Sequence, residues 1–334
     1  MKPLNLFYEE PDPDRWVWFD RYPRKLVRRL VRGRPRVGGQ QRVFLNLCAG
    51  LDELRMPYRI NDYRYIEKHA GDLACIIGKP HVLERREWRN PILFGPATFS
   101  HPVERPAFFA EHPTVRKILV PGDWMRQMWI EHYPADMVEA WAVGIDTELW
   151  SPLDGRRSPP RFDFLLYDKV MWNRERKEPE LLQPIRETLR AAGLTAAEIR
   201  YGHYHEEQFR HLLHEVRGMI FLCEHETQGI AYQQALASGV PILAWDGAGF
   251  WEDPECYPDR VRYKPVSSVP YWDERCGLKF AGMAEFKPKL DQFLSGLDAG
   301  RFSPRQYIVE NLSLADCARR YVDAVQRIIG TRPQ

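Results

Sequence analysis

The sequence predicts an α/β protein of two doubly wound domains that face each other across a cleft. Short apolar runs, typical of parallel strands buried on both faces, alternate with amphipathic helical segments along the chain. The alternation is interrupted at residues 151–161, a stretch rich in Pro, Gly, Ser and Arg that has the composition of a linker. The length of 334 residues also fits about two domains.

The first domain is expected to span residues 1–150. Residues 43–54 have the apolar spacing of a helix. Its predicted strands are short apolar runs at residues 4–8, 58–60, 73–77, 92–94 and 118–120. Strands and helices in this order favour a parallel sheet.

The second domain is expected to span residues 162–315 and to begin with a strand at 162–167. A helix at 178–192, a strand at 199–201 and a helix at 206–215 follow. Near the end of the chain, apolar residues at helical spacing predict a helix over 304–329. The C-terminal segment 316–334, which includes the last part of this helix, is expected to return to the first domain.

Composition excludes several classes of protein. A net charge of +2 and a pI near 8.2 give no general reason to expect nucleic acid as a partner. The chain has no apolar run of membrane-spanning length and no signal-like N-terminus, so we expect a cytoplasmic protein. The six cysteines are scattered and are expected to be reduced thiols. The sequence has no His/Cys cluster at metal spacing, and we expect neither a metal ion nor another cofactor.

Residues 218–245 form the most informative segment of the sequence. A buried strand at 219–223 leads into Glu224, His225 and Glu226, and Gly229 then opens a helix over 230–238. Open α/β sheets bind ligands at the carboxyl ends of their strands, and helix N-termini favour anions. The segment therefore predicts half of a ligand site.

Four segments together resemble glycosyltransferase family 4, whose members use nucleotide sugars and have the GT-B fold. Glu226 to Gln234 matches the Glu-x7-Glu motif of this family except at its last position. The glycine pair Gly38–Gly39, before the first predicted helix, is similar to the glycine-pair loop of this family. The remaining similar segments are Leu119–Trp124 and Val143–Pro152.

The resemblance implies that Glu226 hydrogen-bonds hydroxyls of the donor sugar. It also implies that the backbone at Thr227, Gln228, Gly229 and Ile230 contacts sugar or phosphate. The alternative for Glu226 is a helix-entry residue that only caps the backbone.

Gln234 occupies the position at which the family's second Glu binds the ribose. A carboxylate accepts hydrogen bonds from both ribose hydroxyls, whereas an amide offers one acceptor and one donor group. The change is expected to weaken nucleotide binding by about 1 kcal/mol, on the order of tenfold. The alternative is an ordinary solvated glutamine on a helix.

Cations for the donor diphosphate are expected in the loop after the first strand of the second domain. By resemblance, Lys169 and Lys177 fit best, and Arg174 or Arg176 could take either role. Fixed cations can stabilise a leaving diphosphate where other enzymes use a metal ion. The alternative for at least two of these four residues is a solvated charge run.

Two further candidates come from the first domain. His101 follows a predicted strand, near the place where the family has a histidine that reaches the donor sugar; the alternative is a turn histidine ahead of Pro102. Gly38 and Gly39 are expected to bring backbone N–H groups close to phosphate or acceptor, or else to form a plain tight turn.

Residues 21–36 carry a cluster of basic side chains and no acidic one. Such a segment attracts an anionic membrane surface, an acidic glycan or a phosphorylated acceptor, and its alternative is a basic loop at the rim of the cleft. Peripheral contact with the inner face of a membrane would follow from the first reading.

The resemblance as a whole implies a retaining, metal-independent glycosyltransferase. It would move a hexose-type sugar to a hydroxyl of a glycan, a lipid-linked or a small-molecule acceptor, with Glu226, His101 and Lys177 as the expected catalytic residues. A catalytically weak nucleotide-sugar-binding protein, favoured by Gln234, is the main alternative. An epimerase or phosphorylase of the same fold is a third.

Overall fold

The computed structural model of the chain describes residues 2–10, 38–152 and 159–330, and within them it has two parallel β-sheets. The first sheet has the order β2-β1-β3-β4-β5-β6, and its strands are β1 Leu4–Phe7, β2 Tyr58–Ile60, β3 Ala74–Ile76, β4 Ile92–Phe94, β5 Val115–Val120 and β6 Val138–Ala140. The second has the order β11-β10-β9-β7-β8, and its strands are β7 Phe162–Lys169, β8 Ala196–Arg200, β9 Val216–Cys223, β10 Ile242–Trp245 and β11 Gly277–Phe280. The predicted two-domain, Rossmann-like α/β fold is confirmed.

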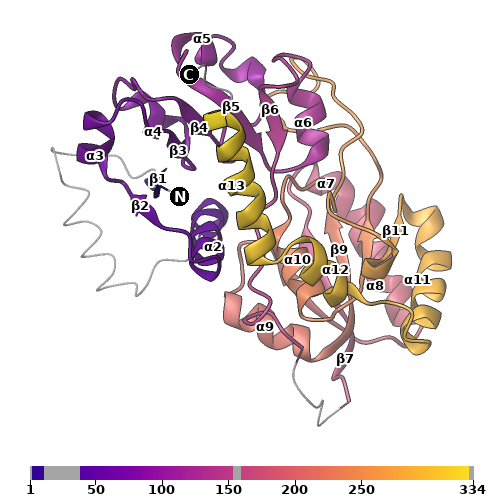
Figure 1. Cartoon of the computed structure of the whole chain (residues 1–334). Helices are drawn as coiled ribbons and strands as arrows, with labels where there is room; N and C mark the ends of the chain where they lie inside the picture. Colours follow the sequence, from indigo (N-terminus) through magenta and orange to yellow (C-terminus); the bar gives the residue numbers. More distant parts are fainter. Residues whose placement is uncertain (1, 11–37, 153–158, 331–334) are drawn as a thin grey trace, which may run out of the picture.

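Helices connect the strands of both domains (Figure 1). Those before the second sheet are α2 Gly39–Glu53, α3 Tyr63–Lys68, α4 Pro80–Glu84, α5 Phe108–Glu111 and α6 Asp123–Trp129. Those that follow β7 are α7 Arg174–Lys177, α8 Gln183–Ala191, α9 Glu206–His214, α10 Ile230–Ala237, α11 Met283–Asp298, α12 Pro304–Asn311 and α13 Leu314–Gly330. The helix expected at 178–192 thus starts earlier, at Arg174, and a π-helical turn at Glu178–Leu182 interrupts it.

Each sheet is buried on both faces because successive side chains of a strand point to opposite sides. In β9, Phe221 packs with residues of α9 and α10, whereas its neighbours Ile220 and Leu222 pack with residues of α8 and α11. In β1, Leu6 and Phe7 divide in the same way between two core clusters. This double burial explains why the strands appear in the sequence as continuous apolar runs.

Helix α13 returns to the first domain and packs against α2, as expected (Figure 1). A Cβ atom at Gly50 of α2 would lie 2.3 Å from the carbonyl oxygen of Leu314, so the two helices approach too closely for a side chain there. The indole of Trp141, just after β6, donates a hydrogen bond to the carbonyl of Cys317 at 2.9 Å. The last helix therefore anchors the C-terminal part of the chain on the first domain.

The prediction of one continuous helix over 304–329 is wrong. Two helices, α12 and α13, are separated at Leu312 and Ser313. The Ser313 hydroxyl accepts a hydrogen bond from the backbone N–H of Asp316, which starts a new helix. The break lets α12 stay on the second domain while α13 crosses to the first.

A long connection between β10 and β11, here called the cross-domain loop (residues 246–276), leaves the second sheet and packs on the first domain. Figure 1 shows it in orange beside α6. Its side chains Trp251, Cys256, Val261 and Val266 are buried in the core formed by β3, β4, β5 and α6. The Tyr263 hydroxyl donates to the carbonyl of Trp124 at 2.9 Å. This loop fixes the two domains together beside the cleft.

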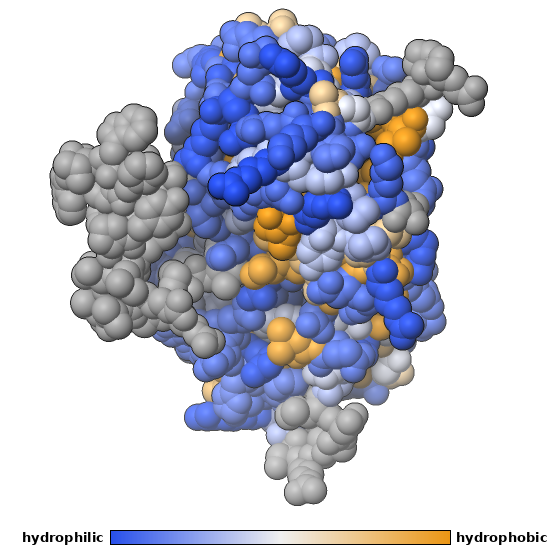
Figure 2. All heavy atoms as spheres, turned by 60° about the vertical axis from the view of Figure 1, so that its left-hand side comes forward, coloured by the Kyte–Doolittle hydropathy of each residue, from blue (hydrophilic) through white to orange (hydrophobic). Residues whose placement is uncertain are grey.

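The outer surface is mostly polar. Figure 2 shows a largely hydrophilic face with separate small hydrophobic patches. In the described part of the chain, no helix is both long and apolar enough to cross a bilayer. The six cysteines are free thiols and buried, as expected. The predicted linker is described only at residues 151–152 and 159–161, and the basic segment 21–36 lies outside the described residues.

Candidate functional site

A cavity of about 1180 Å³ lies between the two sheets, at the carboxyl ends of their strands. The first domain contributes the start of α2 and the loops after β4 and β5, and the second contributes the ends of β7, β8 and β9 with the start of α10. The cross-domain loop adds Trp251 and Asp253. This is the position at which doubly wound domains bind their ligands.

Glu226 and Lys169 form an ion pair on the cavity wall. The Lys169 ammonium, at the end of β7, donates to the Glu226 carboxylate at 2.5 Å. Burial opposes the charged form of Lys169, and the adjacent Glu226 outweighs it, so the pKa of Lys169 is raised. The partner of the Glu226 carboxylate is thus a side chain of β7, and the residue at the N-cap of α10 is Gly229, so Glu226 is not merely a backbone cap. Both side chains are charged and face the same space.

The turn from Glu226 into α10 is built around Gly229. Its backbone is left-handed, with φ of 77°, and an added Cβ would lie 2.0 Å from the ring of Tyr232. Only glycine satisfies both constraints at this position. Thr227, Gly229 and Ile230 line the cavity, so the N-terminus of α10 faces this space.

Gln228 has a structural role that the sequence did not suggest. Its side-chain oxygen accepts from the backbone N–H of Val143 at 3.0 Å, and its side-chain nitrogen donates to the side chain of Gln233 at 3.0 Å. Val143 follows β6, so the amide of Gln228 bridges the two domains at the base of the cavity. Its side chain is occupied, and its backbone carbonyl accepts a hydrogen bond from the side chain of Gln233 at 2.7 Å.

Gln234 lines the cavity and is only 7% exposed, so the alternative of an ordinary solvated glutamine is wrong. Its backbone carbonyl accepts from Ser238. In the described structure its side-chain amide makes no hydrogen bond, which leaves the amide available to a ligand. The position fits the one that the family motif assigns to ribose.

Gly38 and Gly39 lie at the start of α2 and line the cavity opposite the second domain. Neither has a positive φ, and an added Cβ at either would meet no atom of the described residues within 4 Å. A tight turn therefore does not require glycine here. The remaining physical reason for two glycines is the close approach of a ligand to the backbone.

We expect Gly39→Ala to fold at least as stably as the wild type, because alanine loses less backbone entropy in a helix, by up to about 1 kcal/mol. Nucleoside diphosphate binding should fall on the order of tenfold, because the new methyl group occupies ligand space. Thermal unfolding and titration calorimetry measure the two effects. Gly330→Ala, at the end of α13 and away from the cavity, is the control. Unchanged binding by Gly39→Ala would contradict this interpretation.

Lys177 is buried beside the cavity rather than on its wall. Its ammonium donates to Glu252 at 2.9 Å and to Glu224 at 3.1 Å. Its side chain is 8% exposed. The Glu224 carboxylate also accepts from the backbone N–H groups of Met171 and Trp172. Lys177 thus connects the ends of β7 and β9 to the cross-domain loop.

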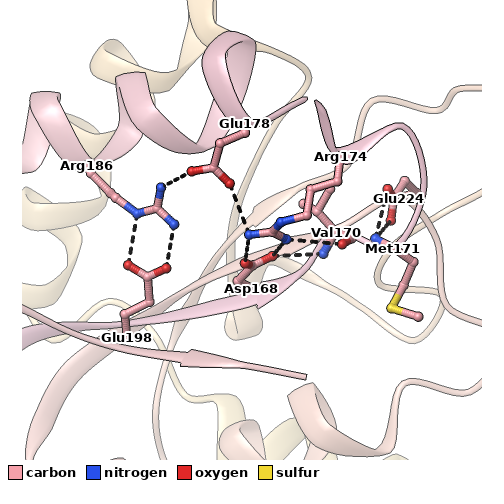
Figure 3. Close-up of polar contacts among 8 residues, drawn as sticks. All are labelled: Asp168, Val170, Met171, Arg174, Glu178, Arg186, Glu198 and Glu224. Atoms are coloured by element: carbon pink, nitrogen blue, oxygen red, sulfur yellow. Dashed lines mark hydrogen bonds and ion pairs between the residues drawn. The ribbon is translucent and has the colours of Figure 1, made fainter. Parts of the chain in front are cut away.

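The two arginines of the predicted cation loop also lie away from the cavity wall. Figure 3 shows the Arg174 guanidinium held between Asp168 and Glu178, at 2.6 Å and 3.0 Å. Arg176 is exposed and pairs with Glu180 at 3.6 Å. Of the four predicted cations, only Lys169 lines the cavity, and the solvated-charge interpretation describes Arg176.

His101 acts as a cap and is not among the cavity-lining residues. Its Nδ1 accepts from the backbone N–H of Val103, and its own backbone N–H donates to the Glu104 carboxylate. Its ring stacks on Trp251 with centroids 5.6 Å apart. Burial, with smaller contributions from His132 and Arg260, lowers the pKa of His101 to about 4, so it is neutral at physiological pH. This geometry matches the turn-histidine alternative.

Several cavity residues were missed by the sequence analysis. Arg42 of α2 pairs with Glu206 of α9 across the cavity rim. The aromatic side chains of Trp124, Trp172 and Tyr201 also line the walls. No sequence signal links Arg42 with Glu206, because their contact arises only when the domains face each other. The aromatic residues carried a weak signal, since Tyr201 ends a predicted strand and Trp124 and Trp172 each follow one.

The charged residues of the described walls are two basic and four acidic side chains. The acids that pair with wall cations are Glu206 and Glu226, while Glu207 and Asp253 have no such pair. The site is therefore not a preformed cluster of free cations. A phosphate group that binds here takes Lys169 over from Glu226.

Solved structures with the same arrangement of two domains are glycosyltransferases of the GT-B fold. The chain is similar to AviGT4, a glycosyltransferase involved in avilamycin A biosynthesis, with a TM-score of 0.57, 13% identity, and coverage of 99% of this chain and 98% of the other. Sucrose-phosphate synthase from Thermosynechococcus elongatus gives a TM-score of 0.55 at 12% identity, with 99% and 100% covered. The lipopolysaccharide outer core galactosyltransferase WaaB gives 0.54 at 10% identity, with 98% and 99% covered.

These similarities extend over the whole chain, and the chain has the GT-B fold. The expected fold is thereby confirmed, while membership of family 4 stays a prediction. No protein-family model matches the sequence, and no curated protein matches it either.

Proposed function

We propose that the protein is a glycosyltransferase that moves a sugar from a nucleotide-diphosphate-sugar to an acceptor hydroxyl. The observation that carries this proposal is the Glu226–Lys169 pair on the wall of a two-domain cavity, opposite the open backbone of Gly38 and Gly39. An acid that orients hydroxyls, a cation for phosphate and an anion-favouring helix start suit a nucleotide sugar. The names of the similar structures support the same class of reaction.

In the proposed reaction, the bond between the sugar C1 and the diphosphate oxygen breaks, and a bond from C1 to the acceptor oxygen forms. The nucleoside diphosphate leaves with the electron pair of the broken bond. We propose retention of configuration, in which a donor phosphate oxygen takes the acceptor's proton on the face from which the nucleotide leaves. The protein then contributes positioning and charge.

Glu226 would accept hydrogen bonds from hydroxyls of the transferred sugar, which we propose to be a hexose. Lys169 would move from Glu226 to the diphosphate as negative charge develops there, and we propose that this lysine makes a metal ion unnecessary. Lys177 would stabilise the leaving diphosphate only if a phosphate oxygen replaced one of its carboxylate partners. In the present structure these partners are Glu224 and Glu252. The backbone at Gly38, Gly39 and the start of α10 would complete the phosphate contacts.

A panel of nucleoside diphosphates and nucleotide sugars, tested first by thermal shift, checks this proposal. A ligand that binds the folded protein stabilises it by RT ln(1 + [L]/Kd) and thereby raises the melting temperature. The best donor is then incubated with glycan, lipid-linked and small-molecule acceptors, with and without a chelator, and products are detected by mass spectrometry. A new glycoside formed equally with chelator present is the expected result. Binding without transfer or hydrolysis would favour a nucleotide-sugar-binding protein instead.

Gln234→Glu is expected to tighten nucleoside diphosphate binding on the order of tenfold, about 1.4 kcal/mol. A carboxylate accepts from both ribose hydroxyls, whereas the amide offers them only one acceptor. Titration calorimetry with a ribonucleotide and its 2′-deoxy analogue measures the effect, which should be smaller for the analogue. Equal or weaker binding of the ribonucleotide would contradict the placement of ribose at residue 234.

A further inference from the structure

His225 occupies a central place on the cavity wall. It lies in the turn between β9 and α10, directly before Glu226, and it lines the cavity. Its ring sits between two indoles, Trp172 at a centroid distance of 4.7 Å and Trp124 at 5.4 Å. Trp124 belongs to the first domain and Trp172 to the second, so the ring lies where the two domains meet.

Both ring nitrogens of His225 are buried and have no hydrogen-bond partner among the described residues. Five side chains in the described ranges have buried polar atoms in this condition, and His225 is the one with two such atoms. Buried polar groups without partners cost stability, so native proteins rarely keep them without a reason. A ligand that supplies the missing partners is such a reason at a cavity wall.

The protonation state of the ring defines the chemistry of the missing partner. Burial, followed by the nearby charges of Lys169 and Lys177, lowers the pKa of His225 to about 3. The imidazole is therefore neutral, with one nitrogen that donates and one that accepts. A phosphate only accepts and would satisfy the donor nitrogen alone. Sugar hydroxyls both donate and accept, so they satisfy either nitrogen.

In the present conformation both ring nitrogens are covered, so contact with a ligand would require the ring to turn. A half-turn about the Cβ–Cγ bond exchanges the positions of the ring nitrogens with those of ring carbons and fills the same space between the indoles. His225 as a whole is only partly buried although its nitrogens are covered, so other atoms of the residue hold its exposed surface. No backbone shift is needed for this exchange.

We propose that His225 hydrogen-bonds hydroxyl groups of the transferred sugar, beside Glu226, and thereby selects the donor sugar. This inference rests on the proposed function of the cavity. It assigns a specificity-determining contact to a side chain outside the Glu-x7-Glu positions. It also gives Trp124 and Trp172 a role, since they hold the ring in place.

The test compares His225→Phe with wild type. Phenylalanine keeps a flat ring between the indoles and removes both nitrogens. The matched control is His81→Phe, because His81 in α4 also has a buried ring nitrogen without a partner and lies away from the cavity-lining residues. Calorimetry gives the affinities for the best nucleotide sugar and for the corresponding nucleoside diphosphate.

We expect the ratio of these two affinities to fall about tenfold in His225→Phe, while the nucleoside diphosphate affinity stays within about twofold of wild type. His81→Phe should leave both values unchanged. Without ligand, His225→Phe should melt no lower than wild type, since it loses two unpaired buried nitrogens. The ratio of the two affinities should fall less in His225→Asn, which keeps a donor and an acceptor, than in His225→Leu. These two variants replace His225→Phe in the test if His225→Phe fails to fold.

An unchanged ratio, or an equal loss for both ligands, would overturn the assignment of His225 and leave the proposed function intact. Melting temperatures clearly below wild type for both His225→Phe and His225→Leu would assign the nitrogens a structural partner and overturn it as well. Failure of wild type to bind any nucleotide or nucleotide sugar would refute the proposed function, and this inference with it.

Discussion

Glu226→Gln is expected to lower the rate of sugar transfer about 100-fold, which is the size of effect seen when one preorganised polar group is removed from an active site. Glutamine has the same shape but no charge, so hydroxyls of the sugar lose their strongest acceptor. Lys169 is at the same time released from its carboxylate partner. Binding of nucleoside diphosphate should therefore stay equal or become tighter while transfer falls.

Initial rates of sugar transfer and calorimetric titrations with nucleoside diphosphate, on the same preparations, measure these two effects. Glu207→Gln is the matched control, because Glu207 lines the cavity and is exposed, without an ion pair to a wall cation. Its rate should remain within about twofold of wild type. Unchanged transfer by Glu226→Gln would contradict the sugar-binding role, and a parallel loss of diphosphate binding would contradict the exchange of Lys169.

Lys177→Ala is expected to lower the free energy of unfolding by about 3 kcal/mol. The substitution leaves the carboxylates of Glu224 and Glu252 without the cation that both of them contact at present. Urea denaturation measures the loss. Lys287→Ala is the control in the same domain, since Lys287 forms an exposed pair with Asp291 and should change stability by about 0.5 kcal/mol or less.

A lower rate in Lys177→Ala can therefore result from unfolding as well as from a loss of catalysis. Lys177 was expected from the sequence to be a catalytic residue, and the two carboxylates that it contacts add a large effect on folding. Rates are therefore to be compared per folded molecule, well below the melting temperature. Unchanged turnover under that condition would contradict a diphosphate role for Lys177.

Most of the fold was predictable because its signals are local. Buried parallel strands require continuous apolar runs, and strands β4 and β9 stand close to their predicted positions. Gly229 carried a similar local signal, since its left-handed backbone and the adjacent Tyr232 both exclude a side chain. The break between α12 and α13 was missed because both segments keep apolar residues at helical spacing.

The site was predicted only in part, because charge pairing depends on contacts between distant residues. The segment from the end of β7 onward offered four cations, and of these Lys169 alone reaches the cavity wall. Lys177 instead pairs with Glu252, which belongs to the cross-domain loop and lies 75 residues later in the chain. The His101 side chain instead caps the turn that follows it, which was the alternative left open by the sequence.

The sequence by itself determined the two-domain α/β order, the Glu226 turn and the glycine-led helix starts, because periodicity and backbone geometry act over a few neighbouring residues. The tertiary structure decided which charges remain available and what forms the walls of the cavity. It placed the cross-domain loop in the core of the first domain, bridged the domains through Gln228, and set His225 between two indoles. These contacts join residues far apart in the chain, and a polar group's partners and burial exist only once the chain has folded.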